Sequence, residues 1–179
     1  MAVDYAGLYP NTHIEGFENV MANLNKEIMA IKQRTMRGLI KSAAYIRNDT
    51  EKTPYITPLD YGNLRSSWFV VTTKGPEPTD RYSTGFKDNP KRKLRASQFV
   101  SDHASTTAEA QSIVRTKSSN NLQFLICGYS ANYALWVHEN LEAKNWSRSM
   151  SGPKWFEGSF KRSTPKIIEI IRENAKIPN

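Results

Sequence analysis

The sequence of 179 residues contains a single cysteine, Cys127. One thiol cannot form a disulfide or a cysteine-based zinc site within one chain. Cys127 ends the apolar run 122–127, where a small hydrophobic side chain packed on a sheet is the expected role. A catalytic thiol would need a histidine and an electropositive setting, and the sequence indicates neither beside Cys127.

Long hydrophobic runs are also missing. No stretch approaches the ~20 apolar residues that a membrane-spanning helix requires, and the mean hydropathy is −0.60. The first residues, Met1 to Tyr5, lack the basic start and apolar stretch of a signal peptide. We therefore expect a protein that is made and kept in the cytosol and that has no membrane partner.

The usual motifs of catalysis and cofactor binding do not occur. His13, His103 and His138 show no metal-ligand spacing, and Glu142 stands where a zinc-protease helix has its second histidine. There is no Gly-x-Ser-x-Gly elbow and no glycine-rich phosphate loop, and the carboxylates are scattered. The sequence therefore predicts no catalytic, cofactor-binding or metal-binding residues. An enzyme whose site is assembled from distant residues stays the least favoured alternative.

Positive charge, by contrast, is abundant. The 25 Lys and Arg residues exceed the 17 Asp and Glu residues, which gives a formal charge of +8 and a pI near 9.6. Such a chain attracts nucleic acid or any acidic surface. The densest cluster comprises Lys91, Arg92, Lys93 and Arg95. It is either a salt-sensitive phosphate contact or a solvated loop that keeps an assembly subunit soluble.

A long helix is predicted from Phe17 to about Ile46, because apolar residues recur there at steps of three and four. The predicted helix spans roughly 30 residues, or about 45 Å, and Pro54 and Pro58 end it. A helix of this length often packs on a sheet of its own chain and on a neighbouring subunit. Residues 1–16 show no periodicity and are expected to form a flexible arm. The predicted stripe consists of Phe17, Val20, Met21, Leu24, Ile28, Ile31, Leu39, Ala43 and Ile46.

Three strands are expected next. Residues 64–73 are rich in aromatic and β-branched residues and end at a Lys-Gly-Pro turn. Residues 110–117 and 121–128 are expected to form a hairpin through the polar turn 118–120. Between the first strand and this hairpin, residues 74–108 show little periodicity and are expected to form a long, basic loop, a candidate contact or lumen loop.

The chain is expected to end with a short helix at 133–139 and an amphipathic helix at 154–175, in which Pro165 is a kink or break. The predicted fold is a single α+β domain over 17–179, with a long N-terminal helix and a C-terminal helix packed on a small, mostly antiparallel sheet. Of the tryptophans, Trp68 and Trp136 are expected in the core and Trp146 on the surface.

The segment 57–67 carries the most distinctive motif. Pro58 fixes its own φ, Asp60 is placed to accept hydrogen bonds from backbone amides, and Gly62 permits a positive φ. Leu64 is then expected to enter the core while Arg65 faces outward. With Asn63, these residues resemble the Pro-x-Asp-Thr-Gly-x-Leu-Arg-x-Ser segment of neck and tail-completion proteins of long-tailed double-stranded DNA phages, with Tyr61 in place of the threonine.

Two later segments are similar to the same family and follow in the same order. Residues 133–140 look like its Tyr-Ala-x-x-Val-Glu segment, with one extra residue before Glu139 and Asn140 where a glycine often stands. Residues 152–156 are similar to its Pro-x-Phe start of the last helix. The resemblance spans residues 17–175, and the 74–108 insertion is its largest departure from the family pattern.

The resemblance implies a non-enzymatic virion protein that is assembled in the host cytoplasm and takes its place in the tail or neck. Such subunits form a homo-oligomeric ring, commonly a hexamer. The ring completes the tail tube and joins it to the head-side connector or adaptor proteins. Lys91, Arg92, Lys93 and Arg95 are candidates for contact with a partner or with DNA passing through the ring. The alternative is a small basic nucleic-acid-binding protein.

Overall fold

The structure is a computed structural model that describes residues 17–52, 54–78, 85–118, 122–143 and 145–177. The predicted α+β class is confirmed, and the expected arm at 1–16 lies outside the described residues. The elements are α1 (Phe17–Asp49), α2 (Asn63–Ser66), β1 (Trp68–Thr72), β2 (Gly75–Pro76), the 3-10 helix η2 (Pro90–Arg92), α3 (Ala96–Ser118), β3 (Ile126–Tyr129), α4 (Ala134–Glu139) and α5 (Trp155–Ala175).

The sheet has three antiparallel strands in the order β2-β1-β3. In the register of β1 and β3, Trp68 lies opposite Tyr129 and Val71 lies opposite Ile126. All five residues of β1 are buried. A strand buried on both faces needs a covering layer on each side, and helices supply both layers.

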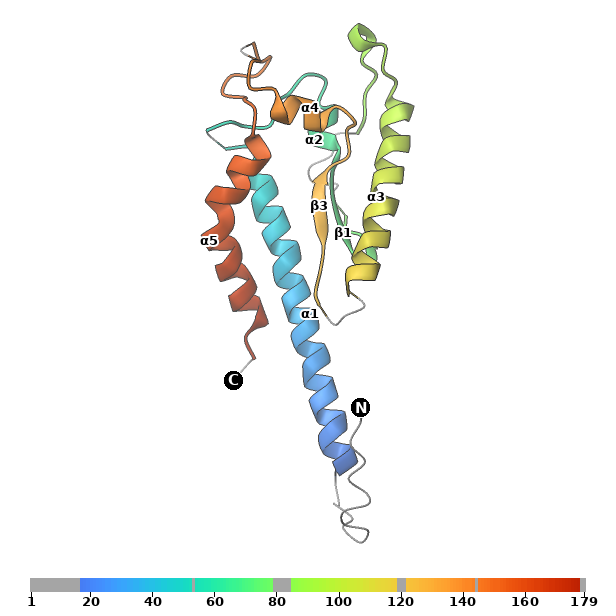
Figure 1. Ribbon diagram of the computed structural model, residues 1–179, viewed down its shortest axis with the longest axis vertical. Coiled ribbons are helices and arrows are strands. Elements are labelled where there is room, and N and C mark those ends of the chain that lie inside the picture. Colours follow the sequence, from blue (N-terminus) through green and yellow to red (C-terminus); the bar gives the residue numbers. More distant parts are fainter. Residues whose placement is uncertain (1–16, 53, 79–84, 119–121, 144, 178–179) are drawn as a thin grey trace.

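Side chains of β1 alternate between these two layers, as strand geometry requires. Trp68 and Val70 pack with Ala43 of α1, whereas Phe69 and Val71 pack with two α3 residues, Ala110 and Val114. The sheet therefore lies between α1 on one face and α3 on the other (Figure 1). Burial of a side chain such as Val71 contributes about 1.5–3 kcal/mol.

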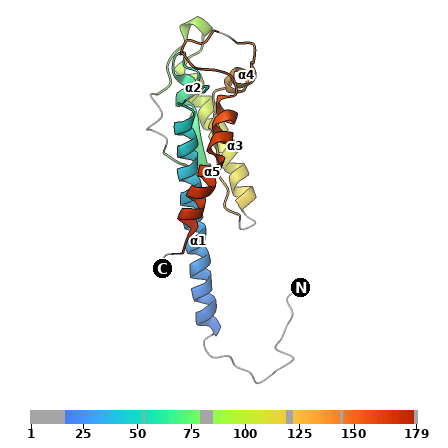
Figure 2. The ribbon, with the colours of Figure 1, turned by 90° about the vertical axis from the view of Figure 1, so that its left-hand side faces the viewer.

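The helix α5 lies along the C-terminal half of α1 (Figures 1 and 2). At Gly38 the two backbones come so close that an added Cβ would be 3.1 Å from the Cα of Ile171. Lys41 Nζ donates to Asn174 Oδ1 at 2.8 Å near the same point. The absence of a side chain at Gly38 thus permits the close approach of α5. Pro165 lies inside α5 without ending it.

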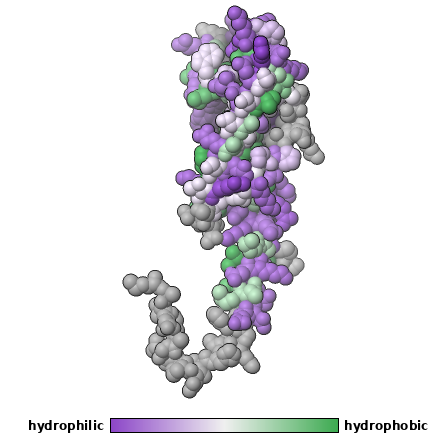
Figure 3. All heavy atoms as spheres, turned by 90° about the vertical axis from the view of Figure 1, so that its right-hand side faces the viewer, coloured by the Kyte–Doolittle hydropathy of each residue, from purple (hydrophilic) through white to green (hydrophobic). Residues whose placement is uncertain are grey.

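The N-terminal half of α1 projects beyond the rest of the described fold (Figure 1). Its apolar side chains are exposed: Leu24, for example, keeps 52% of its surface accessible and Ile28 keeps 40%. Apolar atoms are visible among polar ones along this projection in Figure 3. The helix was predicted correctly, but the other described elements do not bury the N-terminal part of its stripe.

The predicted hairpin is wrong. Residues 110–117 belong to α3, which spans 23 residues and also includes residues 96–108 of the loop expected at 74–108. Only the second predicted strand exists, as β3, and its partner is β1. Within α3 the buried residues stand at helical spacings of eight, three and four: Phe99, Thr107, Ala110 and Val114.

The remaining expectations were closer to the structure. The strand expected at 64–73 is shorter, because residues 63–66 form the single turn α2. The helices expected at 133–139 and 154–175 are confirmed as α4 and α5. Within the described ranges, no helix is both long and apolar enough to cross a bilayer.

Candidate functional site

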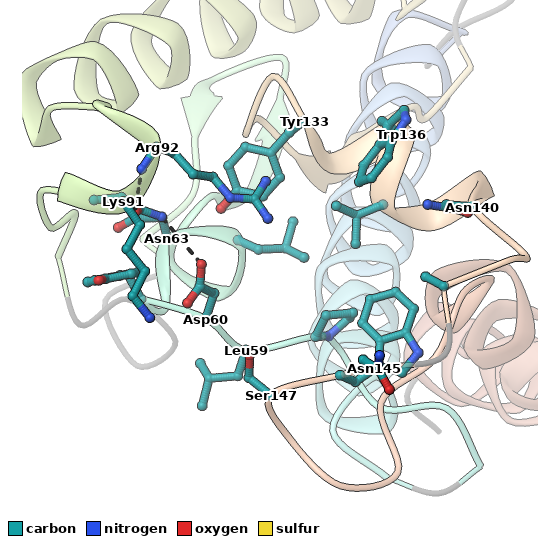
Figure 4. Close-up of a pocket in the computed structure, with 17 residues that line it drawn as sticks. Leu59, Asp60, Asn63, Lys91, Arg92, Tyr133, Trp136, Asn140, Asn145 and Ser147 are labelled. Carbon is teal, nitrogen blue, oxygen red and sulfur yellow. Dashed lines mark hydrogen bonds between the residues drawn. The ribbon is translucent and has the colours of Figure 1, made fainter.

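A pocket of about 380 Å³ opens at the end of the molecule where α2, η2 and α4 meet (Figure 4). It brings together the turn motif, two residues of the basic cluster and the start of the segment after α4, which are far apart in the sequence. A concave site with a few convergent polar groups is a default candidate for binding. The lining residues are Pro58, Leu59, Asp60, Tyr61, Asn63, Leu64, Asn89, Lys91, Arg92, Tyr133, Trp136, Val137, Asn140, Ala143, Asn145, Trp146 and Ser147.

The turn motif forms one wall of this pocket. Gly62 has φ 88° and stands at the N-cap of α2, so the predicted positive φ is confirmed. Any side chain there would be strained, because L residues rarely adopt this conformation. Leu64 is buried, as expected, in a cluster with Val137 and Trp155. It reaches the core from a helical turn, however, rather than from the strand that the sequence predicted.

Asn63 links the turn to Lys87, which precedes η2. Its Nδ2 donates to the backbone oxygen of Lys87 at 2.8 Å, and its Oδ1 accepts from the Lys87 backbone amide at 2.8 Å. A buried amide that makes both bonds imitates one rung of a sheet and is well satisfied. The motif suggested the position of Asn63, but nothing in the sequence indicated Lys87 as its partner.

The carboxylate of Asp60 faces the basic wall of the pocket (Figure 4). Its Oδ2 accepts from the Asn89 side chain at 3.3 Å, a side-chain donor where the sequence predicted backbone amides. The pKa of the neighbouring Tyr133 is raised to about 12, mainly by burial; Arg92 and a backbone hydrogen bond with Leu64 lower this pKa, and Asp60 raises it. The Tyr133 phenol is therefore a neutral hydrogen-bonding group at physiological pH.

The four basic residues named from the sequence do not act as one group. Lys91 and Arg92, on η2, line the pocket, whereas Lys93 and Arg95 are exposed outside it. Lys93 has a left-handed φ of 53° at the C-cap of η2, and this reversal of the chain separates it from the pocket. Two cations thus face the pocket and two face solvent.

The tryptophans near the pocket reverse the sequence-based expectation. Trp136 was predicted to be in the core, but 63% of its surface is exposed. The helix α4 has only six residues and buries Val137, so its neighbours Leu135 and Trp136 point away from the core. Trp146, expected on the surface, is half-buried against the cluster that contains Leu64 and Val137.

Arg65, the last charged residue of the motif, is held by a carboxylate outside the pocket. Glu51 Oε1 lies 2.7 Å from Arg47 Nη1 and 3.1 Å from Arg65 Nε. Its Oε2 lies 2.6 Å from Arg148 Nη1. Burial raises the pKa of Glu51, but the three arginines outweigh burial and hold the pKa below its ordinary value. Arg65 is therefore bound within the fold, through a contact that sequence reasoning missed.

Other reactive groups are hydrogen-bonded or buried. His103 Nδ1 lies 2.7 Å from Ser130 Oγ, but Ser130 is buried and also donates to the Ser67 backbone oxygen at 3.2 Å. This pair connects α3 to the residue that follows β3, and the Ser130 hydroxyl is not exposed to a substrate. Burial lowers the pKa of His103 and raises that of Cys127 to about 11, so Cys127 carries little thiolate at neutral pH.

His138 is engaged on both ring nitrogens. Its Nδ1 lies 2.7 Å from Glu139 Oε1, and its Nε2 accepts from the backbone amide of Glu157 at 3.3 Å. Among the described residues, no group of three or more His, Cys, Asp or Glu side chains is placed to hold a metal ion. Comparison of the chain with protein-family models, curated proteins and solved structures gives no match.

Proposed function

We propose that this chain is a structural virion subunit that acts at the head–tail junction of a tailed phage. In this role it forms a homo-oligomeric ring that completes the tail tube and joins it to a head-side connector. The proposal starts from the resemblance of residues 57–67, 133–140 and 152–156 to neck and tail-completion proteins. The structure adds a physical reason to favour an assembly role.

The observation that carries the proposal is that the subunit exposes apolar side chains at both ends of its long axis. At one end, Leu135, Trp136 and Leu141 around α4 are each more than 60% exposed. At the other end, the projecting half of α1 exposes Leu24 and Ile28. Exposed apolar surface of this kind marks protein–protein contact sites, and a subunit in a ring between two partners needs more than one.

The pocket end suits a protein partner of acidic character. Lys91 and Arg92 stand on one wall, and Trp136 stands at the opposite rim (Figure 4). Aromatic residues and arginine are the side chains most enriched at the centres of interfaces. On this proposal, the motif residues shape the docking end, and the basic residues steer the partner toward it.

Electron microscopy of particles produced without this protein tests the proposal. We expect full heads and separate, unattached tails. Complementation with the wild-type chain should restore joined particles, and Leu135→Glu/Trp136→Glu should not. Ile113→Glu, which alters an exposed apolar residue on α3, is the matched control and should complement. Normally joined particles in the absence of the protein would contradict the proposal.

One observation favours a second candidate, nucleic-acid binding. Two cations and an exposed tryptophan share the pocket, a combination that suits phosphate contact with base stacking. If this role is correct, affinity for an oligonucleotide should fall steeply as salt increases. It should also fall in Lys91→Ala/Arg92→Ala but change little in Lys93→Ala/Arg95→Ala, whose side chains lie outside the pocket. No binding at ~50 mM salt would remove this candidate.

A further inference from the structure

One face of α1 carries a regular apolar series that no other described element covers. Met21, Leu24, Ile28 and Ile31 follow one another at steps of three, four and three residues, and all four are exposed. These steps place the side chains on a single seam, as the a and d positions of a heptad repeat do. We call these four residues the α1 seam.

The α1 seam continues a contact that already exists within the chain. Gly38 stands seven residues after Ile31, at the equivalent heptad position, and there α1 touches Ile171 and Asn174 of α5. The helix α5 ends at Ala175, immediately past these contacts. From Gly38 onward α5 covers one face of α1. Toward the N-terminus no described helix covers this same face.

We propose that the α1 seam binds the α1 seam of a second copy of this chain, with the two helices antiparallel. In this arrangement Met21 meets the partner's Ile31, and Leu24 meets the partner's Ile28. The two-fold axis generates each of these two contacts a second time. The dimer therefore has four layers of paired side chains, and every residue of the seam takes part in them. Each subunit supplies the second helix that the other lacks.

The position of α5 favours the antiparallel direction. From Gly38 onward, α5 occupies the face on which the other helix must lie. In a parallel pair, the α1 helix of each subunit would meet the α5 helix of the other from Gly38 onward, and the two would overlap. An antiparallel partner runs the other way, so that its folded body lies past the N-terminal end of α1, where Figures 1 and 2 show no other helix or strand.

The charges along α1 favour the same direction. Residues 18–31 carry two acids and one base, Glu18, Lys26 and Glu27. Residues 32–41 carry four bases and no acid: Lys32, Arg34, Arg37 and Lys41. In the antiparallel register that pairs Met21 with Ile31, Glu18 lies level with the partner's Arg34, whereas parallel pairing places the two basic stretches side by side. Charges that flank an apolar seam set helix orientation in this way.

This contact is isologous and does not by itself close a ring. It assigns an occupant to the α1 end, which is one of the two exposed apolar regions on which the proposed function rests, and it leaves the pocket end free for other partners. The pairing is tested on the purified chain alone, so its failure can be told apart from failure of the head–tail assignment, which is tested by the form of the assembled particles.

Sedimentation equilibrium of the purified full chain tests the pairing. We expect a concentration-dependent monomer–dimer equilibrium. Leu24→Glu/Ile28→Glu should weaken it by at least ~100-fold, because apolar contacts are lost in all the central layers. Asn19→Glu/Asn23→Glu adds the same charge on the other side of α1 and should change the affinity far less. Both control positions are exposed, so neither variant disturbs the core.

A monomeric wild-type chain at ~100 μM would overturn the proposal and leave residues 1–16 or a different protein to cover the seam. Equal association of the wild type and the seam variant would overturn it too. Circular dichroism of each variant confirms that the fold is retained, as expected for substitutions on an exposed surface.

Engineered disulfides test the direction of the helices, with Cys127 left in place because it is partly buried and its raised pKa keeps the thiol protonated. Met21→Cys/Ile31→Cys should give a covalently linked dimer on mild oxidation, since antiparallel pairing brings these positions together. Each single variant should not, because its two thiols would be about 15 Å apart along the helix. Efficient linkage of the single variants, or failure of the double variant, would contradict the antiparallel seam.

Glu27 provides a finer test of direction. In the antiparallel arrangement the two Glu27 side chains approach each other near the two-fold axis, so Glu27→Gln should tighten the dimer by about two-fold. In a parallel arrangement Glu27 would flank the partner's Lys32, and the same substitution would loosen the dimer. A weaker dimer would therefore overturn the antiparallel direction.

Discussion

The two halves of α1 carry the same apolar spacing but lie in different surroundings. In the C-terminal half, Ala43 and Ile46 are almost fully buried, and α5 and the sheet supply the covering atoms. In the N-terminal half, Leu24 and Ile28 keep about half of their surface exposed. Periodicity thus shows which face of a helix is apolar, but it does not show whether the covering surface belongs to the same chain.

The largest contrast is expected from matched truncations in the two halves. Ile46→Ala should lower the free energy of unfolding of the monomer by about 2–5 kcal/mol, because it leaves a cavity at a site that is only 3% exposed. Leu24→Ala should change it by less than about 0.5 kcal/mol, since that site is exposed. Urea denaturation, at a protein concentration too low for the dimer to form, measures both free energies of unfolding. Equal losses of stability in the two variants would show that the two halves of α1 do not differ in burial.

Glu51 lies just after the C-terminal end of α1 and forms ion pairs with three arginines. Removal of its carboxylate should have the next largest effect on stability. Glu51→Gln leaves the buried Arg47 without its carboxylate and should lower stability by about 1.5–3 kcal/mol at neutral pH. The comparison variant is Glu169→Gln, whose carboxylate pairs only with an exposed Lys166 and should contribute less than about 1 kcal/mol.

The acid dependence of this contribution follows from the direction of the pKa shift. The folded pKa of Glu51 lies below the ordinary value of 4.5, so the folded state favours the carboxylate. Its contribution is complete above the unfolded pKa and is lost as the pH falls through the folded pKa. The stability difference between wild type and Glu51→Gln should therefore be constant near neutral pH and shrink below about pH 4.5. A difference that grew in acid would contradict the assigned ion pairs.

Gly38 marks the boundary between the halves, and its substitution should have an intermediate effect. A leucine there would overlap the Ile171 backbone of α5, so Gly38→Leu should destabilise the chain by about 1–3 kcal/mol. Amide hydrogen exchange should show the loss concentrated in α5 and the C-terminal half of α1. An unchanged α5 would indicate that the close approach at Gly38 contributes little.

The smallest stability effect is expected at Trp136. Because this side chain is mostly exposed, Trp136→Ala should change the free energy of unfolding by less than about 0.5 kcal/mol. Trp68→Ala, on the face of β1 that packs against α1, should lower the free energy of unfolding by about 3–5 kcal/mol. Thermal melts of the two variants show directly whether Trp136 contributes to stability as an exposed or as a buried side chain. A large loss of stability in Trp136→Ala would indicate that Trp136 lies in the core, as the sequence predicted.

The sequence predicted the long elements because their apolar residues are large and regularly spaced. The stripe of α1 and the isoleucines of α5 identified both helices. The helix α3 was missed, since its inward face includes small or polar residues such as Thr107 and Ala110. Its last turns contain Ile113, Val114 and Thr116, and these β-branched residues resemble a strand when read locally.

The candidate site was predictable only in part. The turn motif identified Gly62 and Leu64 because local conformation determines their roles. The partners of Asn63 and Arg65 come from positions 87 and 51, and no local pattern encodes such tertiary contacts. Trp136 was misplaced because hydrophobicity alone favours burial, whereas a helix of six residues can bury only one narrow side.

The close approach at Gly38 also has a mechanical consequence. About 20 residues of α1 extend from Gly38 to the N-terminal tip, a rod of about 30 Å at 1.5 Å per residue. A tilt of about 10° at this fulcrum would displace the tip by about 5 Å, in proportion to that length. A small tilt where α1 meets α5 would therefore be amplified at the N-terminal tip of the helix.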